Sequence, residues 1–277
     1  MPGIISSRTR RLYQRPPSGP VCLNRGSSQA QGLVGFWPVQ GQPGGIDCSG
    51  RMLDLTATGT TSASGPPDGG LALSFNGSSD KLELSSPVVT GTPLTLAAWF
   101  SVTGAGADTR VLLTSMDAGG TNGYFLALET DSKVYAYTFG SAFPGAASAT
   151  SYTTAGEWQH ATAVFLASND RAAYLNGTGK GTNTTASTTG ALTTTAIGYG
   201  SFGGAWFDSQ LAHCCAWDRA LSDAEVWSLY DPATRWDLYY PLGSRVWSFD
   251  TVAAAATTFQ RTVGPRFALA GRGGLAG

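Results

Sequence analysis

Short runs in which apolar and polar residues alternate dominate the chain, as in "KVYAYTF" (133–139) and "RAAYLNG" (171–177). A period of two is typical of a half-buried β-strand, and the stretches between the runs carry the Gly, Asn, Asp and Pro that favour turns. The pattern predicts strands at 32–39, 71–75, 80–84, 94–102, 110–115, 123–129, 133–139, 158–166, 171–177, 193–200 and 206–217. So many short strands predict an all-β protein, a two-sheet antiparallel sandwich.

One segment breaks this pattern and predicts a short helix, "CCAWDRALSDAEVWSLYDP" at 214–232. Ser222 and Glu225 have the spacing of a capping box, in which each side chain bonds the other's backbone. Apolar positions at 224, 226, 227 and 230 then recur with helical spacing, and Pro232 ends the turn.

The two ends of the chain differ in composition from its middle. Residues 1–31 are predicted to form an extended basic arm, because "RPPSGP" favours a polyproline-like conformation. Residues 32–231 form the predicted sandwich, and 232–277 a C-terminal extension and arm. The Ser-, Thr- and Gly-rich stretches 140–156 and 178–192 are predicted to be loops within the sandwich.

The net charge of −1 hides an uneven distribution of charge. Residues 1–26 and 251–277 contain arginine and no acidic residue, whereas 27–250 contain nine basic and all 18 acidic residues. Basic ends on an acidic body favour contact with another acidic protein surface. Nucleic acid is a poorer fit, because Pro, Gly and Ser separate the arginines. The predicted assembly residues are Arg8, Arg10, Arg11, Arg15, Arg25, Arg261, Arg266 and Arg272.

Five segments occur in the order seen in a known family: "LALSFNGSSDKLEL", "LTLAAWFSV", "EWQHATAVF", "AAYLNGTGKGT" and "AWFDSQLAHCCAWDRALSDAEVWSLY". In this order the chain resembles a laminin-G-like domain of the concanavalin A-like superfamily. The resemblance implies a jelly-roll sandwich with the helix closing one end, its Val226, Trp227 and Tyr230 packed inward. The flanks "GLVGFW" and "LYDPATRWDLYYPLGSRVW" resemble laminin-G-like proteins encoded by tailed bacteriophages.

The sequence shows no catalytic pattern. Glycanases that share the jelly roll carry alternating carboxylates on one strand, and no such triplet occurs here, so we expect no enzyme. His160 falls in a predicted core strand, and His213 and Cys214 are adjacent strand residues that face opposite ways. Four cysteines are too few for a disulfide scaffold. Of the neighbours Cys214 and Cys215, we expect one buried thiol and one nearer the surface.

Calcium is a ligand that the resemblance implies, held by loop oxygens at one rim. Asp80 in "NGSSDKLEL" is the acid carried over by motif position, with Asp208 in "WFDSQL" as its neighbour. Ala212 and His213 stand where the family often has two further acids. The alternative is that Asp80 caps a turn.

Sugar binding requires exposed aromatic rings beside polar groups. The candidates on or beside the long loops are Phe143, Tyr152, Phe202 and Trp206, whereas Trp99, Trp158 and Trp217 are predicted core residues.

These observations predict that the chain is a structural protein of a phage or phage-like particle, namely a decoration, head-fibre or tail-associated module. Its arms would contact other virion proteins, it would form a homo-oligomer, and it would be located in the virion after assembly in the host cytoplasm. The alternative is a lectin-like adhesin that binds host surface polysaccharide. The chain has no apolar run of a length that spans a membrane and no secretory signal pattern, so no membrane partner is expected.

Overall fold

The computed structural model describes residues 22–40, 44–66, 70–104 and 106–240. Arg25 is the one predicted assembly arginine within them; Arg8, Arg10, Arg11, Arg15, Arg261, Arg266 and Arg272 lie outside.

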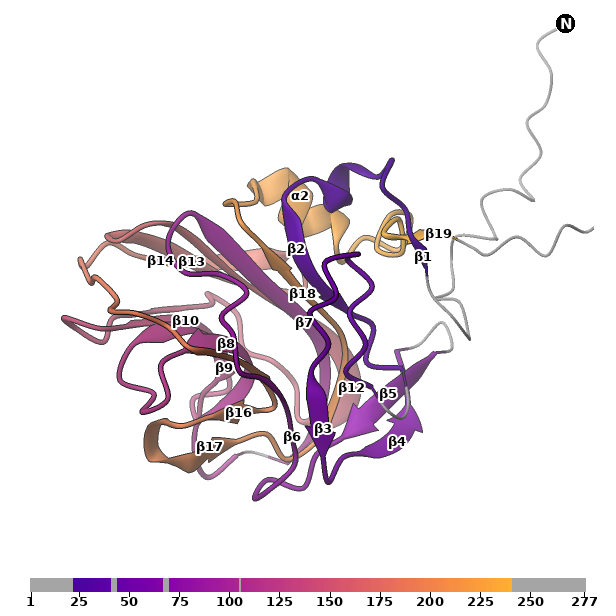
Figure 1. The fold of residues 1–277 in the computed structure, drawn as a ribbon, viewed down its shortest axis with the longest axis horizontal. Helices are drawn as coiled ribbons and strands as arrows, with labels where there is room; N and C mark the ends of the chain where they lie inside the picture. The colour runs from indigo at the N-terminus through magenta and orange to yellow at the C-terminus, as the bar shows by residue number, and fades with distance from the viewer. Residues whose placement is uncertain (1–21, 41–43, 67–69, 105, 241–277) are drawn as a thin grey trace, which may run out of the picture. The chain divides into compact units, whose positions relative to one another are not determined.

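Two antiparallel sheets face each other and make up most of the described residues (Figure 1). One has the order β11 (Gly145–Ala147), β10 (Val134–Phe139), β9 (Gly123–Leu128), β8 (Arg110–Met116), β15 (Thr194–Ile197), β6 (Lys81–Leu84) and β3 (Thr56–Thr58). The other has the order β14 (Thr178–Asn183), β13 (Asp170–Leu175), β12 (Ala155–Ala167), β7 (Leu94–Thr103), β18 (Gln210–Trp217), β5 (Leu71–Ser74) and β4 (Thr61–Ser64), and β2 (Leu33–Trp37) also pairs with β18. The predicted two-sheet sandwich is confirmed.

Smaller elements complete the described part of the chain. β1 (Cys22–Leu23) pairs with β19 (Tyr239–Tyr240), and β16 (Tyr199–Gly200) pairs with β17 (Ala205–Trp206). The helical segments are η1 (Ser28–Ala30), η2 (Phe202–Gly204) and α2 (Asp223–Ser228). No helix among the described residues is long and apolar enough to cross a membrane.

The core between the sheets follows from the alternation of side chains along each strand. On β7, Leu96, Ala98 and Phe100 point toward the other sheet, while Ala97 and Trp99 point to the outer side. On β10, Val134 and Ala136 belong to the core between the sheets. The opposite face of each sheet is therefore free to carry a different layer.

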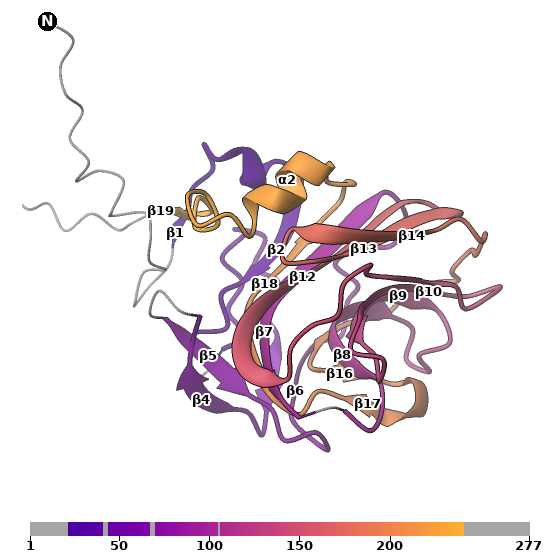
Figure 2. The same ribbon diagram turned by 180° about the vertical axis from the view of Figure 1, so that it is seen from behind.

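On the outer face of the eight-stranded sheet, that layer is a second apolar core. Helix α2 and the segment before β19 cover this face, as Figures 1 and 2 show from two sides. Val226, Trp236 and Tyr239 pack there against Trp99 and Trp217. The helix thus covers a sheet face, and residues 232–240 belong to the folded domain.

This second core corrects two predictions. Cys214 lies in the core between the sheets and Cys215 in the outer core, so they do face opposite ways, but both are buried. Trp227 is 42% exposed, while Val226 is fully buried. Trp227 is held at the edge of the layer, where its ring meets Gly177 of the β13–β14 turn.

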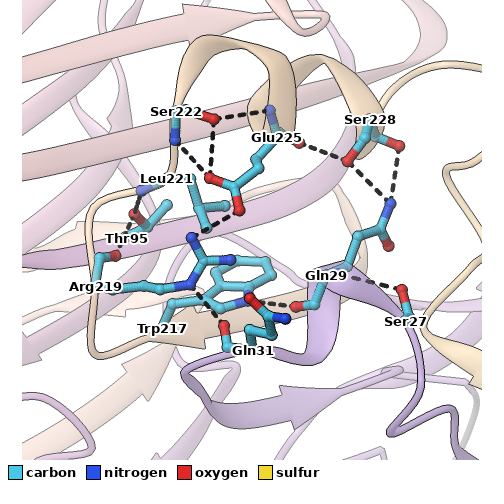
Figure 3. A network of polar contacts seen from close by, with 10 residues as sticks. All are labelled: Ser27, Gln29, Gln31, Thr95, Trp217, Arg219, Leu221, Ser222, Glu225 and Ser228. Atoms are coloured by element: carbon cyan, nitrogen blue, oxygen red, sulfur yellow. Dashed lines mark hydrogen bonds and ion pairs between the residues drawn. The ribbon is translucent and has the colours of Figure 1, made fainter.

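Residues 22–31 are also part of the fold, which corrects their assignment to an extended arm. The side-chain Nε2 of Gln29 donates to the backbone carbonyl of Ser228 at 3.0 Å, and the Trp217 indole donates to the backbone carbonyl of Gln29 at 2.7 Å (Figure 3). The predicted capping box is present, with Ser222 and Glu225 bonded in both directions. Arg219 joins the two segments, donating to the carbonyl of Gln31 and pairing with Glu225 at 2.8 Å.

The predicted loops 140–156 and 178–192 contain strands β11 and β14, each the edge of its sheet. The alternation rule missed them because edge strands are partly solvated and need no apolar face. The two edges lie close together: the amide of Ala149 donates to the carbonyl of Gly179 at 2.7 Å. A Cβ atom at Gly181 would lie 1.6 Å from the carbonyl oxygen of Ala147. Glycine therefore allows this side of the sandwich to close.

Candidate functional site

The outer face of the seven-stranded sheet carries a row of aromatic rings. Tyr135, Tyr137 and Phe139 alternate along β10 and so lie on one face. The rings of Tyr135 and Tyr137 are stacked, with centroids 5.0 Å apart and planes at 15°. Across the strand pair, a Cβ atom at Gly145 would lie 2.3 Å from the Tyr137 ring. Glycine at this position leaves room for the two rings.

Two further rings extend the row at its Phe139 end. Phe143 lies 5.1 Å from Phe139 between centroids, and Phe202 lies 4.7 Å from it. Phe143 is 63% exposed, the most exposed aromatic side chain of the cluster. We refer to Tyr135, Tyr137, Phe139, Phe143 and Phe202 as the aromatic face.

Acidic groups lie at the other end of the aromatic face. The Tyr135 hydroxyl donates to Asp131 Oδ2 at 3.1 Å, and Thr109 Oγ1 donates to Glu129 Oε1 at 2.8 Å. Burial raises the pKa of Tyr137, and the nearby carboxylate of Glu129 raises it further. The pKa of Tyr135 is raised for the same reasons, first burial and then Asp131. Both phenols therefore stay protonated at neutral pH, beside carboxylates that can accept hydrogen bonds.

A hairpin lies beside this face and carries a second aromatic pair. Tyr199 on β16 and Trp206 on β17 have ring centroids 4.2 Å apart. The ammonium of Lys81 lies 5.0 Å from the centre of the Tyr199 ring and pairs with Glu83 at 2.6 Å. The hairpin thus carries the half-buried indole of Trp206, and the Lys81 ammonium beside it is already paired with Glu83.

The structure places three of the four predicted sugar-binding residues on or beside the aromatic face and buries the fourth. Phe143 and Phe202 lie on the aromatic face, and Trp206 lies on the hairpin beside it. Tyr152 does not lie on a rim: it is buried, packs edge-on against Phe100, and its hydroxyl donates to the carbonyl of Glu129. The expectation of an exposed ring at 152 is wrong, because the segment before β12 folds inward.

The sequence analysis missed Tyr135, Tyr137, Glu129 and Asp131. Their signal was present in "ETDSKVYAYTF", where two tyrosines alternate with core residues directly after two acids. Alternation shows that two faces exist, but not which of them is left open to solvent.

The two predicted calcium ligands have different surroundings. Asp80 is buried, and the hydroxyl of Ser79 lies 3.3 Å from its Oδ1. Asp208 Oδ1 pairs with the buried guanidinium of Arg110 at 3.0 Å. Among the described residues no group of three His, Cys, Asp or Glu side chains could hold a metal ion. The calcium site remains a prediction, and Arg110 already compensates the charge of Asp208.

The buried histidines and thiols occupy packed positions. Burial lowers the pKa of His160 to about 3 and that of His213 to about 3, the latter helped by the neighbouring His160. Burial also raises the pKa of Cys214 and of Cys215. Neither a thiolate nor an imidazolium is therefore favoured here at neutral pH.

The sandwich and its aromatic face define a protein with a lectin-like fold. The family model for the concanavalin A-like lectin/glucanases superfamily matches residues 76–227, and the chain belongs to this superfamily. The predicted laminin-G-like resemblance is thereby confirmed. None of the curated proteins compared with the chain matches it.

Solved structures share this fold at low identity. Domain 4 of AbnA, an extracellular arabinanase from Geobacillus stearothermophilus solved with arabinotriose, has a TM-score of 0.59 and 19% identity over 72% of this chain and 98% of that domain. The binding domain of Paraclostridial Mosquitocidal Protein 1 has a TM-score of 0.58 and 15% identity over 73% of this chain and 52% of that one. The receptor binding domain of botulinum neurotoxin type G has a TM-score of 0.54 and 10% identity over 72% and 50%. The chain thus spans about half the length of the two toxin chains.

Proposed function

We propose that this chain is a carbohydrate-binding module and that its aromatic face holds the sugar. The observation that carries the proposal is the stacked pair Tyr135 and Tyr137 beside Asp131 and Glu129. A pyranose or furanose ring presents C–H groups that pack on an aromatic ring and hydroxyls that need hydrogen-bond partners. Binding sites commonly combine such apolar surface with a few polar groups that set orientation.

The geometry favours an extended glycan over a single sugar. The two tyrosine rings follow one another along β10, and beyond the buried Phe139 lies the exposed Phe143, so a chain of several sugar units can contact more than one ring. The acids at the Tyr135 end accept hydrogen bonds from hydroxyls and repel anionic sugars. Domain 4 of AbnA, which shares the fold, was solved with an arabinotriose, and this supports a short neutral oligosaccharide as the first ligand to test.

We further propose that the module has no hydrolytic activity. This proposal is supported by the sequence, which lacks the alternating carboxylate triplet of glycanases that share the jelly roll. Glu129 and Asp131 lie at one end of the aromatic face and are bonded to Thr109 and Tyr135. An oligosaccharide that binds should be recovered intact, without new reducing ends.

The placement of the module on a phage or phage-like particle belongs to the same proposal. It is supported by the arginines of residues 1–21 and 251–277, stretches without an acidic residue that flank an acidic domain. Such ends can pair with carboxylates of neighbouring virion subunits, and repetition in a homo-oligomer would strengthen weak contacts. The test is co-sedimentation of the chain lacking residues 1–21 with its particle; undiminished incorporation would argue against the arm as the anchor.

The sugar-binding proposal is tested by affinity electrophoresis and calorimetry with neutral polysaccharides and their oligomers. Tyr135→Ala and Tyr137→Ala should each weaken binding by about tenfold, or about 1.4 kcal/mol, because each removes an aromatic surface on which the C–H groups of a sugar pack. Trp227→Ala is the matched control, because it removes an exposed ring from α2, away from the aromatic face. Equal loss in the control, or no loss in either tyrosine variant, would contradict the proposal.

A further inference from the structure

A cleft of about 290 Å³ lies between the N-terminal segment and the loop that follows β2. Its wall includes Leu23, Arg25, Gly32, Ser49, Gly50 and Arg51. Two cationic side chains thus border one concavity. The cleft lies in the N-terminal part of the domain and shares no residue with the aromatic face.

The two guanidinium groups keep donors available toward this cleft. Arg25 Nη2 donates to the carbonyl oxygen of Ser49 at the long distance of 3.4 Å. Arg51 Nη2 lies 3.9 Å from Asp218 Oδ2, and both side chains are more than half exposed. A guanidinium has five N–H donors, so these contacts use few of them. Exposed pairs at such distances hold little energy and can rearrange around a ligand.

The backbone beside Arg25 is shaped to admit its guanidinium. Gly50 has φ of +87°, a conformation that favours glycine, and a Cβ atom there would lie 2.3 Å from Arg25 Nη2. Any side chain at 50 would displace the guanidinium from its place above the loop. The loop itself is held by Asp47, whose Oδ1 accepts from the amides of Phe36 and Ser49.

The cleft also adjoins the place where both described ends of the domain meet. Leu23, in its wall, belongs to β1, and Cys22 pairs with Tyr240 of β19. Positions 22 and 240, the two ends of the described part of the chain, therefore lie side by side, and the sequence continues before 22 and after 240. These outlying stretches contain Arg8, Arg10, Arg11 and Arg15 on one side and Arg261, Arg266 and Arg272 on the other.

We propose that this cleft binds a carboxylate side chain of an acidic peptide segment in a partner protein. Two forked guanidinium groups suit a planar carboxylate, which each can bind through two parallel hydrogen bonds. Leu23 and Leu33 supply an apolar wall for the methylene stem of the side chain. A nucleic-acid backbone fits less well, because a row of phosphates needs a row of cations, and Arg25 and Arg51 are the cationic residues that line this cleft. The proposal is independent of sugar binding.

The experiment uses the full chain and a capped peptide of six glutamates, with the matching glutamine peptide as probe control. Binding is followed by calorimetry and by the ¹⁵N–¹H signals of Gly32 and Gly50. We expect the glutamate peptide to shift both amides and the glutamine peptide to shift neither. Arg25→Gln together with Arg51→Gln should weaken the binding at the cleft by about tenfold or more. Lys81→Gln together with Lys180→Gln is the charge-matched control, because Lys81 pairs with Glu83 on β6, Lys180 pairs with Asp223, and neither lysine lines the cleft.

All variants retain the arginines of residues 1–21 and 251–277. The outcomes therefore separate binding of the peptide in the cleft from its general attraction to these basic ends. Equal affinity of the double variant and the wild type, with no shift at Gly32 or Gly50, overturns the proposal. A stronger response of the same two amides to inorganic phosphate or to single-stranded DNA than to the peptide also overturns it. An unchanged melting temperature of the double variant shows that the loss reflects binding and not unfolding.

Discussion

Acidification from about pH 7 to about pH 5 should destabilise this domain through His160 and His213, the two histidines of the chain. Both are buried in the outer core, and burial lowers the pKa of each to about 3. They line a cavity of about 20 Å³ whose other lining residues include Arg235 and Trp236 but no carboxylate. Nothing in that lining can compensate an imidazolium, and Arg235 adds a like charge.

The stability falls with pH because burial lowers the pKa of both histidines. A histidine takes up a proton in the unfolded chain below its ordinary pKa of about 6.5, but not in the folded domain. The stabilisation is therefore complete above about pH 6.5 and is lost as the pH falls. At about pH 5 each histidine removes about 2 kcal/mol from the free energy of unfolding, or about 4 kcal/mol together. That is a large share of the free energy of unfolding of a typical domain, which is about 5–15 kcal/mol.

Urea unfolding followed by tryptophan fluorescence at several pH values between about 5 and 7 measures this effect. His160→Phe and His213→Asn should each remove about half of the pH dependence. Asparagine is chosen at 213 because the backbone there has φ of +50°, which asparagine tolerates. The pKa of Asp237 is raised by burial and by Asp231, and its contribution has the opposite sign. A free energy of unfolding that stays flat over this range, or variants with the wild-type slope, would refute the reasoning.

Three substitutions test the packing and capping, and calcium addition or removal tests the predicted metal site. Gly181→Ala should lower the free energy of unfolding by about 2 kcal/mol, because the new Cβ meets the backbone oxygen of Ala147; a neutral effect in urea unfolding would mean that the two edges can separate freely. Ser222→Ala should cost about 1 kcal/mol through loss of the helix cap, with less helical signal in circular dichroism. Arg171→Lys should cost about 2 kcal/mol, because its buried guanidinium donates to four partners that one ammonium cannot all reach; an unchanged urea midpoint would contradict this. Calcium or a chelator should leave the melting temperature unchanged, because Arg110 already pairs with Asp208; a calcium-dependent rise would instead support the predicted site.

The fold could largely be predicted from local pattern. Alternation located the central strands of both sheets, and the spacing of Ser222 and Glu225 located the helix and its cap. These features depend on residues close together in the chain, so the sequence carries them directly. The edge strands β11 and β14 were missed because their stability comes from pairing with a neighbouring strand and from close contact between backbones, which polar and glycine residues satisfy.

The candidate site depended on more than local pattern. Phe143 and Phe202 were identified, but Tyr135 and Tyr137 were missed, and Tyr152 was wrongly placed at the surface. All five are aromatic residues in or beside strands, so residue type and period do not distinguish them.

By itself the sequence determined that this chain forms a two-sheet sandwich with one capped helix, because strand period and capping chemistry are local properties. Only the tertiary structure decided which residues cover each outer sheet face and which aromatic rings there stay accessible. Residues 22–31 and 229–240 cover the outer face of the eight-stranded sheet and bury Cys215 and Trp217 there. On the outer face of the seven-stranded sheet, Phe125 and Phe139 are buried, Tyr135 and Tyr137 are half-buried, and Phe143 is 63% exposed. The covering segments lie up to about 200 residues apart in the chain, and burial depends on what packs from such distances, which periodicity does not record.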